Sequence, residues 1–326
     1  MGFWNDITPK CANCGKKYTE VALFKRKEGI FCLPCVRQLF IKFNEDPESN
    51  NWNELITPKT FDDYVGQEAI KKELRTMLDA TSRHKIPVQH VLFSGSFGLG
   101  KTTIAKIFAS NIGDSEIVNA IDIKSPDFPT AKSVVIDEIH TIQDEEWLLS
   151  IMDKTKQTIL GATTTAGRLS GPLRSRFVSL VLQPYTDEEM KRIILGAAKN
   201  LKYECPSYLA ESVAKRGKAT ARVGLFLFKR IYDRLALNNY KVTPKLLTEW
   251  FKEMNVDDDG LDNADRAYIN GLSDKPVGLQ NLSAVTGFDR ITIEEAIEPY
   301  LLVKGFVKRT PRGRILGDRK VLPIWT

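Results

Sequence analysis

The sequence predicts an α/β protein in which a parallel sheet covered by helices is followed by a helical domain and a winged helix, and preceded by a small cysteine-rich module. Three observations support this fold class. A glycine-rich loop separates an apolar strand at 91–93 from a helical stretch that starts at 103. A second apolar strand, 132–136, ends in two carboxylates, and the residues from 256 on combine three helical patterns with a basic hairpin. Strands that alternate with helices are typical of a parallel sheet.

The size and composition of the chain describe a multidomain globular protein. It has 326 residues, 42% of them hydrophobic and 27% charged, and this length favours two or three domains over a single core. No apolar run approaches the roughly 18 residues that cross a bilayer, so no membrane association is expected. The first residues lack the pattern of a secretory signal, so we expect a cytoplasmic protein, and a phage protein in the host cytoplasm would fit. The net charge of +6 permits a nucleic-acid partner.

Four of the five cysteines form two C-x₂-C pairs, Cys11 with Cys14 and Cys32 with Cys35, separated by seventeen residues. This spacing is typical of a closed, structural Cys₄ zinc site, and the metal would stabilise a segment too short to fold by itself. A redox C-x-x-C needs a surrounding βαβ pattern, and none is visible. Lysines and arginines make this zinc-binding module basic, which suits nucleic acid or an acidic protein surface as well as a solvated face.

A glycine-rich loop at Gly95–Thr102 fits the pattern G-x-x-x-x-G-K-[ST]. The preceding Val91–Phe93 has the composition of a buried strand, and the residues from Thr103 on have helical apolar spacing. A chance glycine-rich turn would lack this order of strand, loop and helix, which a phosphate-binding loop requires. The sequence therefore predicts a nucleoside triphosphate site.

The parts of this loop have different expected roles. Its glycines let backbone N–H groups turn toward a polyphosphate at the positive end of the helix. Lys101 supplies charge for the β- and γ-phosphates, and the Thr102 hydroxyl can ligate Mg²⁺. The other residues expected at the nucleotide are Gly95, Ser96, Phe97, Gly98, Leu99, Gly100 and Thr103.

Two carboxylates follow the second apolar strand. In a nucleotide hydrolase of this type, Asp137 would hold Mg²⁺ and Glu138 would orient or deprotonate the attacking water. Such a strand end is common by itself, but its place thirty-five residues after Thr102 makes it a second signal. His140 has no histidine partner nearby, so we expect it to pack or to form hydrogen bonds.

Three further candidates surround these motifs. Thr163 and Thr164 end the next strand pattern, where a polar side chain can sense the γ-phosphate or position water. Arg174 and Arg176 are two residues apart, and an arginine from a neighbouring subunit can stabilise transition-state charge, although a surface pair is the plain alternative. Tyr64-Val65 offers contacts suited to adenine, but both are also ordinary packing residues.

The rest of the chain is mostly helical. Four helices are predicted after residue 185 as a lid, with Arg222 near the start of one of them, at 187–200, 208–215, 222–237 and 243–254. Three more, 261–272, 279–286 and 291–303, precede a hairpin with Pro-Arg-Gly at its tip, which together predict a winged helix. Residues 304–320 carry seven basic side chains against one acid, which suits phosphate contact or a solvated basic hairpin. The expected domains are therefore 1–40 (zinc), 41–56 (linker), 57–184 (nucleotide-binding), 185–255 (lid) and 256–326 (winged helix).

These motifs together resemble the RuvB family of AAA+ ATPases, the motors of Holliday-junction branch migration, over about residues 57–320. The resemblance rests on Tyr64-Val-Gly-Gln, Gly98-Leu-Gly-Lys-Thr-Thr, Ile136-Asp-Glu-Ile-His, Gly161-Ala-Thr-Thr, Ser170-Gly-Pro-Leu-Arg-Ser-Arg-Phe, Gly260-Leu-Asp, Pro276-Val-Gly-Leu, Thr292-Ile-Glu, Glu298-Pro-Tyr-Leu and Arg309-Thr-Pro-Arg-Gly-Arg. It implies adenine contact at Tyr64 and Val65, a sensor at Thr163 or Thr164, an arginine finger at Arg176 acting across a ring interface, and a second sensor at Arg222. It also implies DNA contact by the wing, where Arg309, Arg312 and Arg314 lie.

Three features depart from the family pattern. The phosphate loop has Ser96-Phe97 where the family has Pro-Pro, and the zinc module is not a family feature. Only twenty-three residues separate Asp137 from Gly161, which leaves no room for the β-hairpin that RuvB proteins dock on RuvA. We therefore do not expect a RuvA-type adaptor, and the short layout is closer to a clamp loader.

The leading hypothesis is an ATP- and Mg²⁺-dependent homo-oligomeric ring, expected as a hexamer, that translocates on or remodels DNA. One alternative is a clamp-loader-like ATP switch that grips DNA without translocating, with the zinc module recruiting a protein partner. A non-enzymatic DNA-binding adaptor is disfavoured, because Lys101, Asp137, Glu138 and Arg176 are all present.

Overall fold

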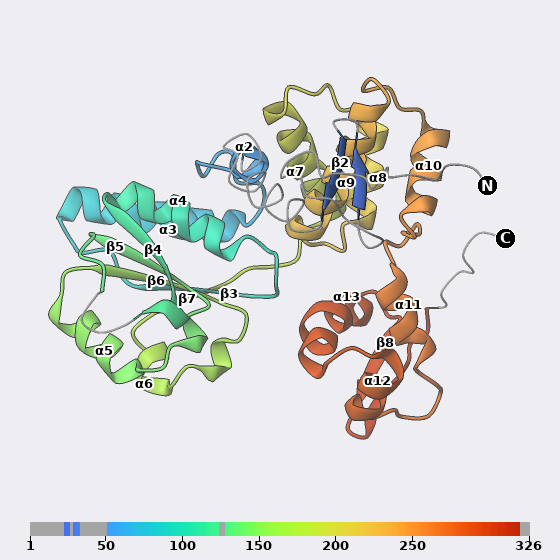
Figure 1. Ribbon diagram of the computed structural model, residues 1–326. Coiled ribbons are helices and arrows are strands. Elements are labelled where there is room, and N and C mark those ends of the chain that lie inside the picture. Colours follow the sequence, from blue (N-terminus) through green and yellow to red (C-terminus); the bar gives the residue numbers. More distant parts are fainter. Residues whose placement is uncertain (1–22, 27–28, 33–50, 124–127, 320–326) are drawn as a thin grey trace, which may run out of the picture. The chain divides into compact units, whose positions relative to one another are not determined.

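The computed structural model describes residues 23–26, 29–32, 51–123 and 128–319, and the chain divides into two compact units, Met1–Thr57 and Pro58–Thr326 (Figure 1). In the first unit, β1 (Leu23–Arg26) and β2 (Gly29–Cys32) pair as an antiparallel hairpin. The helix α2 (Asn51–Ile56) lies in the stretch expected as a linker. The expected zinc ligands Cys11, Cys14 and Cys35 lie outside the described residues, and Cys32 is the last residue of β2.

The second unit begins with a five-stranded parallel sheet in the order β4-β5-β6-β3-β7. Its strands are β3 (Val91–Ser94), β4 (Ser115–Asn119), β5 (Ser133–Asp137), β6 (Thr158–Thr163) and β7 (Val178–Val181). The three central strands were predicted from their apolar runs. The edge strands β4 and β7 were missed because many of their side chains are exposed, so neither shows such a run.

Helices cover both faces of this sheet, as Figure 1 shows: α3 (Glu68–His84) and α4 (Lys101–Ile112) on one face, α5 (Glu145–Lys154) and α6 (Gly171–Arg174) on the other. Successive side chains of β3 enter different cores, because they alternate across a strand. Val91 and Phe93 pack in the core under α3 and α4, whereas Leu92 packs in the core under α5 and α6. A strand buried on both faces must be apolar throughout, which is why it could be predicted.

The connection from β5 to β6 is short. It runs over residues 138–157 and contains a single turn of 3₁₀-helix (Ile139–Thr141) and α5, joined by short segments. No strand pair occurs between Asp137 and Thr158, and the structure describes all of these residues. The expectation that this segment has no room for a docking hairpin is confirmed.

Four helices follow the sheet: α7 (Asp187–Asn200), α8 (Ser207–Arg216), α9 (Ala221–Leu237) and α10 (Pro244–Glu253). All four were predicted to within a residue or two of their ends. Thr243 caps α10 by accepting a hydrogen bond from the Leu246 N–H, and Pro244 occupies the first turn, where its missing N–H has no cost. Within the described part of the chain, no helix is long and apolar enough to cross a bilayer.

The last part of the unit is a winged helix with its own core. It consists of α11 (Asn263–Asn270), α12 (Leu279–Thr286), a π-helical turn (Thr292–Ile297) that continues into α13 (Glu298–Val303), and the antiparallel strands β8 (Val307–Thr310) and β9 (Gly313–Leu316). The third helix was predicted as one element over 291–303. Pro299 has no N–H for the bond to the preceding turn, and the backbone widens just before it.

One buried carboxylate joins the wing to the helices. Glu298 is fully buried and accepts hydrogen bonds from Tyr268 Oη at 2.5 Å, from Arg309 Nε at 2.9 Å and from Arg314 Nε at 2.8 Å. Burial by itself would raise the pKa of Glu298, but the hydrogen bonds from Arg314, Tyr268 and Arg309 outweigh it and hold that pKa below its usual value. The two wing arginines are therefore committed, at least in part, to holding the wing in place.

We expect Glu298→Ala to lower the free energy of unfolding by about 3–5 kcal/mol, because it leaves partly buried arginines without their counter-charge. Urea unfolding followed by tryptophan fluorescence measures this. The matched control is Glu295→Ala on the same helical segment, where the side chain is exposed, and it should change stability by less than about 0.5 kcal/mol. Equal effects of the two substitutions would contradict this assignment.

Candidate nucleotide-binding site and DNA interface

The phosphate loop connects the end of β3 to the start of α4. Gly95, Gly98 and Gly100 have φ angles of 142°, 76° and 90°, a region that favours glycine. Their conformation turns the loop around the N-terminus of α4, where unpaired N–H groups and the helix dipole attract an anion. The geometry therefore fits the polyphosphate site that the motif predicted.

Lys101 is the first residue of α4 and its side chain folds back into the loop. Its Nζ donates to the carbonyl oxygens of Gly95 and Ser96, both at 3.0 Å, and the residue is buried. Burial lowers the pKa of Lys101, while the nearby Glu138 and Asp137 carboxylates oppose this. These contacts hold an ammonium group inside the phosphate loop, and its role toward the β- and γ-phosphates stays a prediction.

Thr102 and Asp137 come together from two elements. The Thr102 hydroxyl at the start of α4 donates to Asp137 Oδ1 at 2.9 Å, at the end of β5. Two neighbouring oxygens of this kind suit Mg²⁺, which completes its shell with water and phosphate oxygens. Among the residues that the structure describes, no group of three or more His, Cys, Asp or Glu side chains could hold a metal by itself.

Glu138 combines a strained backbone with a carboxylate oxygen that is buried and unpaired. Its backbone is left-handed, with φ of 48°, and its Oε2 is buried without a hydrogen-bond partner in the described residues. That oxygen lies 3.3 Å from His140 Nδ1, but without hydrogen-bond geometry. His140 Nδ1 instead contacts Thr163 Oγ1 at 3.0 Å, which confirms the hydrogen-bonding role expected for this histidine.

The two threonines at the C-terminal end of β6, Thr163 and Thr164, have different surroundings. Thr163 is fully buried, contacts His140 and accepts a hydrogen bond from the Thr165 N–H at 3.0 Å. Thr164 is only partly buried. Because Thr163 is engaged in this inner network, the more exposed Thr164 is the better placed of the two to meet a ligand, and its sensor role stays a prediction.

Arg222 lies against the phosphate loop. It is the second residue of α9, its N–H donates to the Gly98 carbonyl at 3.2 Å, and its guanidinium lies 3.9 Å from the centre of the Phe97 ring. This distance is typical of a cation–π contact. A residue more than 120 positions along the chain from Gly98 is therefore held beside the loop, in keeping with its predicted place at the start of a lid helix.

Arg176 has its partners elsewhere. Its Nε and Nη2 donate to the two carboxylate oxygens of Asp153 at 2.9 and 2.8 Å, and its Nη1 donates to the Pro172 carbonyl at 3.1 Å. None of these described contacts reaches the phosphate loop of the same chain, which fits a side chain offered to a neighbouring subunit. Asp153, near the end of α5, was missed, since no sequence pattern connects it with Arg176.

Tyr64 braces the phosphate loop from behind. It is buried, and its hydroxyl donates to the Leu99 carbonyl at 3.1 Å, while the Tyr185 hydroxyl donates to the same carbonyl at 2.8 Å. Burial raises the pKa of Tyr64 well above its usual value, so the hydroxyl stays protonated and can donate. Val65 is partly buried, and adenine contact by this pair stays a prediction. Tyr185 was not singled out from the sequence.

The wing arginines expected at DNA differ in their exposure and in their ion pairs. Arg314 is largely buried between Glu294 and Glu298, and Arg309 is half-exposed but bound to Glu298. Arg312 is exposed at the tip of the hairpin, between the paired residues Thr310 and Gly313. Of the three expected DNA contacts, Arg312 is thus the one whose side chain has no such internal commitment.

The fold and this site define a class: an α/β P-loop nucleotide-binding protein with an attached winged helix. Residues 56–156 match the family described as "Holliday junction DNA helicase RuvB P-loop domain", and residues 258–321 match "RuvB C-terminal winged helix domain". The chain is 36% identical over 300 residues to the Holliday junction branch migration complex subunit RuvB of Campylobacter jejuni strain RM1221, covering 81% of this chain and 90% of that one. It is 35% identical over 303 residues to the protein of the same name from Thermotoga maritima, covering 82% and 91%.

The same relationship holds in three dimensions. The solved structure of the Thermotoga maritima RuvB Holliday junction branch migration motor superimposes with a TM-score of 0.75 and 37% identity, covering 81% of this chain and 96% of that one. The chain belongs to the RuvB family.

The tight contact behind the loop gives a test of its geometry. Gly100→Ala would place Cβ 2.7 Å from the Tyr64 hydroxyl, at a φ of 90° that costs other residues about 1–2 kcal/mol. We expect about tenfold weaker binding of a fluorescent ATP analogue, measured by titration. Gly167→Ala is the control, because a Cβ there meets nothing within 4 Å, and it should leave the affinity unchanged. Unaltered binding by the Gly100 variant would refute the tight packing.

Proposed function

We propose that this chain is an ATP-driven DNA motor that assembles as a ring, a hexamer by family resemblance, and drives branch migration of Holliday junctions in recombination and repair. The relatives that cover four-fifths of the chain carry this activity in their names. The observation that carries the proposal is the buried Glu138 oxygen without a hydrogen-bond partner, beside the Thr102–Asp137 pair and the Lys101 ammonium. A buried carboxylate oxygen is costly to leave unpaired, so its persistence favours a catalytic role.

Each residue of the site has a separate proposed role in ATP hydrolysis. Lys101 and the loop amides bind the phosphates, and Mg²⁺, held by Thr102 and Asp137, would neutralise their developing charge. Glu138 orients the attacking water and accepts its proton, with His140 alongside. Arg222, which contacts Phe97 and Gly98, links the position of the phosphate loop to the lid helices. Thr164 senses the γ-phosphate or positions the water. Tyr64 and Val65 flank the adenine.

A further positive charge at the nucleotide would come from the neighbouring subunit of the ring. Arg176 is proposed to reach the γ-phosphate bound by a neighbouring subunit, while in the free chain its guanidinium is hydrogen-bonded to Asp153. The winged helix contacts the DNA backbone through Arg312 at its tip, with Arg309 and Arg314 behind it. The proposed division of labour follows the domains at 57–184, 185–255 and 256–326.

We expect Glu138→Gln and Arg176→Ala to lower DNA-stimulated ATP hydrolysis by roughly 10³-fold, the scale of transition-state contributions in related nucleotide hydrolases. An equimolar mixture of Arg176→Ala with Lys101→Ala should recover part of the activity, because some interfaces then pair an intact phosphate loop with an intact arginine. Arg174→Ala is the matched control and should stay within about twofold of wild type, since surface substitutions away from the site have small effects. Full turnover by either variant, or no recovery in the mixture, would refute the mechanism.

A second function is favoured by the short connection between β5 and β6. A clamp-loader-like switch would hydrolyse ATP on DNA without moving a junction, and it would need no RuvA-type adaptor. The same preparations distinguish the two functions on a labelled four-way junction: migration supports the motor, and hydrolysis without migration supports the switch. Partner recruitment, in either case, is assigned to the zinc module.

We also propose that Cys11, Cys14, Cys32 and Cys35 hold one structural Zn²⁺. The pairing of Leu23 with Cys32 supports this, because the chain after Cys14 enters, and the chain toward Cys35 leaves, at the same open end of the β1–β2 hairpin. Cys205 takes no part: burial raises the pKa of its thiol to about 11, so it stays protonated and a poor ligand.

Purified protein should therefore contain one zinc per chain by atomic absorption. Cys14→Ser and Cys35→Ser should each lose most of it, because a Cys₄ shell needs all four thiolates. Cys205→Ser is the control and should keep full zinc content. Stoichiometric zinc in either of the first two variants would exclude this ligand set.

A further inference from the structure

The loop between α8 and α9, residues 217–220, has an unusual backbone. Lys218 and Ala219 have φ angles of 51° and 53°, so two successive residues other than glycine are left-handed. Such a conformation costs free energy and persists where the surrounding contacts hold it. The loop is held from two sides.

On one side the loop and the residues just after it touch the nucleotide site. A Cβ on Gly98 would meet Thr220 Cγ2 at 2.7 Å, so the loop packs directly on the phosphate loop. The Ala219 carbonyl accepts from the Tyr185 N–H at 3.0 Å, and the Tyr185 hydroxyl in turn donates to the Leu99 carbonyl. Because of these contacts, a movement of the phosphate loop on nucleotide binding would also move residues 217–220.

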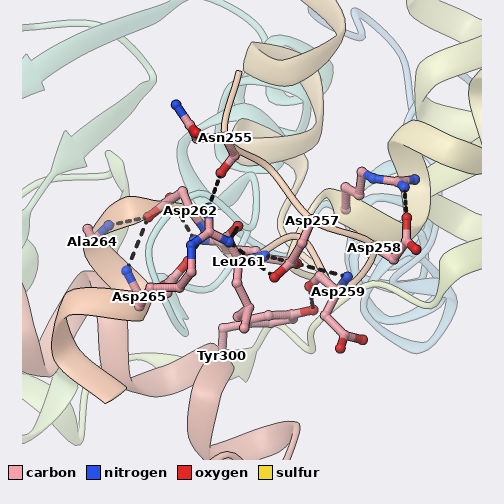
Figure 2. A network of polar contacts seen from close by, with 12 residues as sticks. Asn255, Asp257, Asp258, Asp259, Leu261, Asp262, Ala264, Asp265 and Tyr300 are labelled. Atoms are coloured by element: carbon pink, nitrogen blue, oxygen red, sulfur yellow. Dashed lines mark hydrogen bonds and ion pairs between the residues drawn. The ribbon is translucent and has the colours of Figure 1, made fainter. Parts of the chain in front are cut away.

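On the other side the loop touches the winged helix. Lys218 Nζ pairs with Asp262 Oδ2 at 2.9 Å and with Asp265 Oδ2 at 2.5 Å. Figure 2 shows these two aspartates at the start of α11, where Asp262 accepts from the Ala264 and Asp265 N–H groups as the helix cap. The Lys218 side chain is 12% exposed and that of Asp265 only 1%, so the pair is shielded from solvent.

The charge state of this pair depends on both partners. Burial raises the pKa of Asp265 to about 6, and Lys218 limits that rise. Burial would also lower the pKa of Lys218, but the Asp265 and Asp262 carboxylates more than compensate and raise it. Without Lys218 the buried Asp265 would lack the cation that keeps it charged.

The connector between α10 and α11, residues 254–262, is itself held by contacts with α8 and α13. Asp258 pairs with Arg216 at the end of α8, and a Cβ on Gly260 would lie 2.6 Å from the Arg216 carbonyl oxygen. The Asp259 carbonyl accepts from the Tyr300 hydroxyl at 2.5 Å, as Figure 2 shows. The end of α8 and the start of α11 are therefore joined by several contacts, and Lys218 lies two residues before Thr220, which packs on the phosphate loop.

We propose that Lys218 is a positioning residue that couples the nucleotide state of the phosphate loop to the winged helix, through its ion pairs with Asp262 and Asp265. The inference rests on the proposed function, because it assumes that the winged helix binds DNA. Nucleotide binding moves the loop at 217–220, and Lys218 transmits the movement to the first turn of α11. By thermodynamic reciprocity, DNA binding changes nucleotide affinity by the same factor.

The test compares Lys218→Met with the control Lys215→Met, an exposed lysine near the end of α8. Affinity for a labelled DNA duplex is measured by fluorescence anisotropy with and without a non-hydrolysable ATP analogue, alongside ATPase rates without DNA. In wild type and the control we expect the analogue to change DNA affinity by about fivefold or more, the usual lower range of coupling between sites. In Lys218→Met this ratio should fall to within about twofold, with the basal ATPase rate unchanged.

A second variant guards against loss of folding. Asp262→Asn removes one charge but keeps a side chain that caps a helix well, so α11 should stay formed. It should weaken the coupling in the same direction as Lys218→Met. Wild-type coupling in both variants would overturn the role of Lys218 while leaving the proposed function intact. Absence of coupling in wild type, with no DNA binding, would overturn both.

Discussion

Two tyrosine hydroxyls that converge on one backbone carbonyl hold the nucleotide site in shape. Tyr64 and Tyr185 both have their hydroxyls within donating distance of the Leu99 oxygen, and the two hydroxyls lie 3.1 Å apart. The phosphate loop must present its N–H groups inward, so its carbonyls point away and need partners. A buried carbonyl left without one would cost about 1–3 kcal/mol and would loosen the loop. Tyr185 also ties the loop to residue 219, which makes it part of the route toward the winged helix.

Many of the charged groups expected to meet ligands are satisfied internally in the free chain. Arg176 is held by Asp153, and Arg309 and Arg314 are held by Glu298. An arginine that is already ordered loses less side-chain entropy when it meets a phosphate, which is the benefit of preorganisation. The same arrangement separates the wing's arginines into two that shape the hairpin and one, Arg312, that is exposed at its tip.

The departures from the family pattern lie in a few places. Phe97 stands in the phosphate loop where the family has proline, and its ring is the surface on which Arg222 lies. The connection between β5 and β6 is reduced to residues 138–157, which hold one 3₁₀ turn and the helix α5. Both changes leave the sheet and the Thr102–Asp137 pair intact, because neither alters the two cores that position the strand ends. A core of this kind tolerates change in the loops that it carries.

The sequence by itself determined the phosphate loop, the central strands and the helices after residue 185, because each carries a local signal. Strands buried on both faces must be apolar, amphipathic helices repeat every 3.6 residues, and the loop needs glycine at positive φ. Arg176 and Arg222 were candidates from their positions in the sequence, and the family resemblance added their roles as arginine finger and second sensor. Only the tertiary structure decided which partners these side chains find. The residues missed from the sequence are separated along the chain from the groups they bind: Asp153, Tyr185, Glu298 and Lys218. A contact between separate segments produces no periodic pattern in the sequence, so it could not be predicted. The exposed edge strands β4 and β7 were missed for a related reason: their pairing with neighbours, rather than any apolar run, makes them strands.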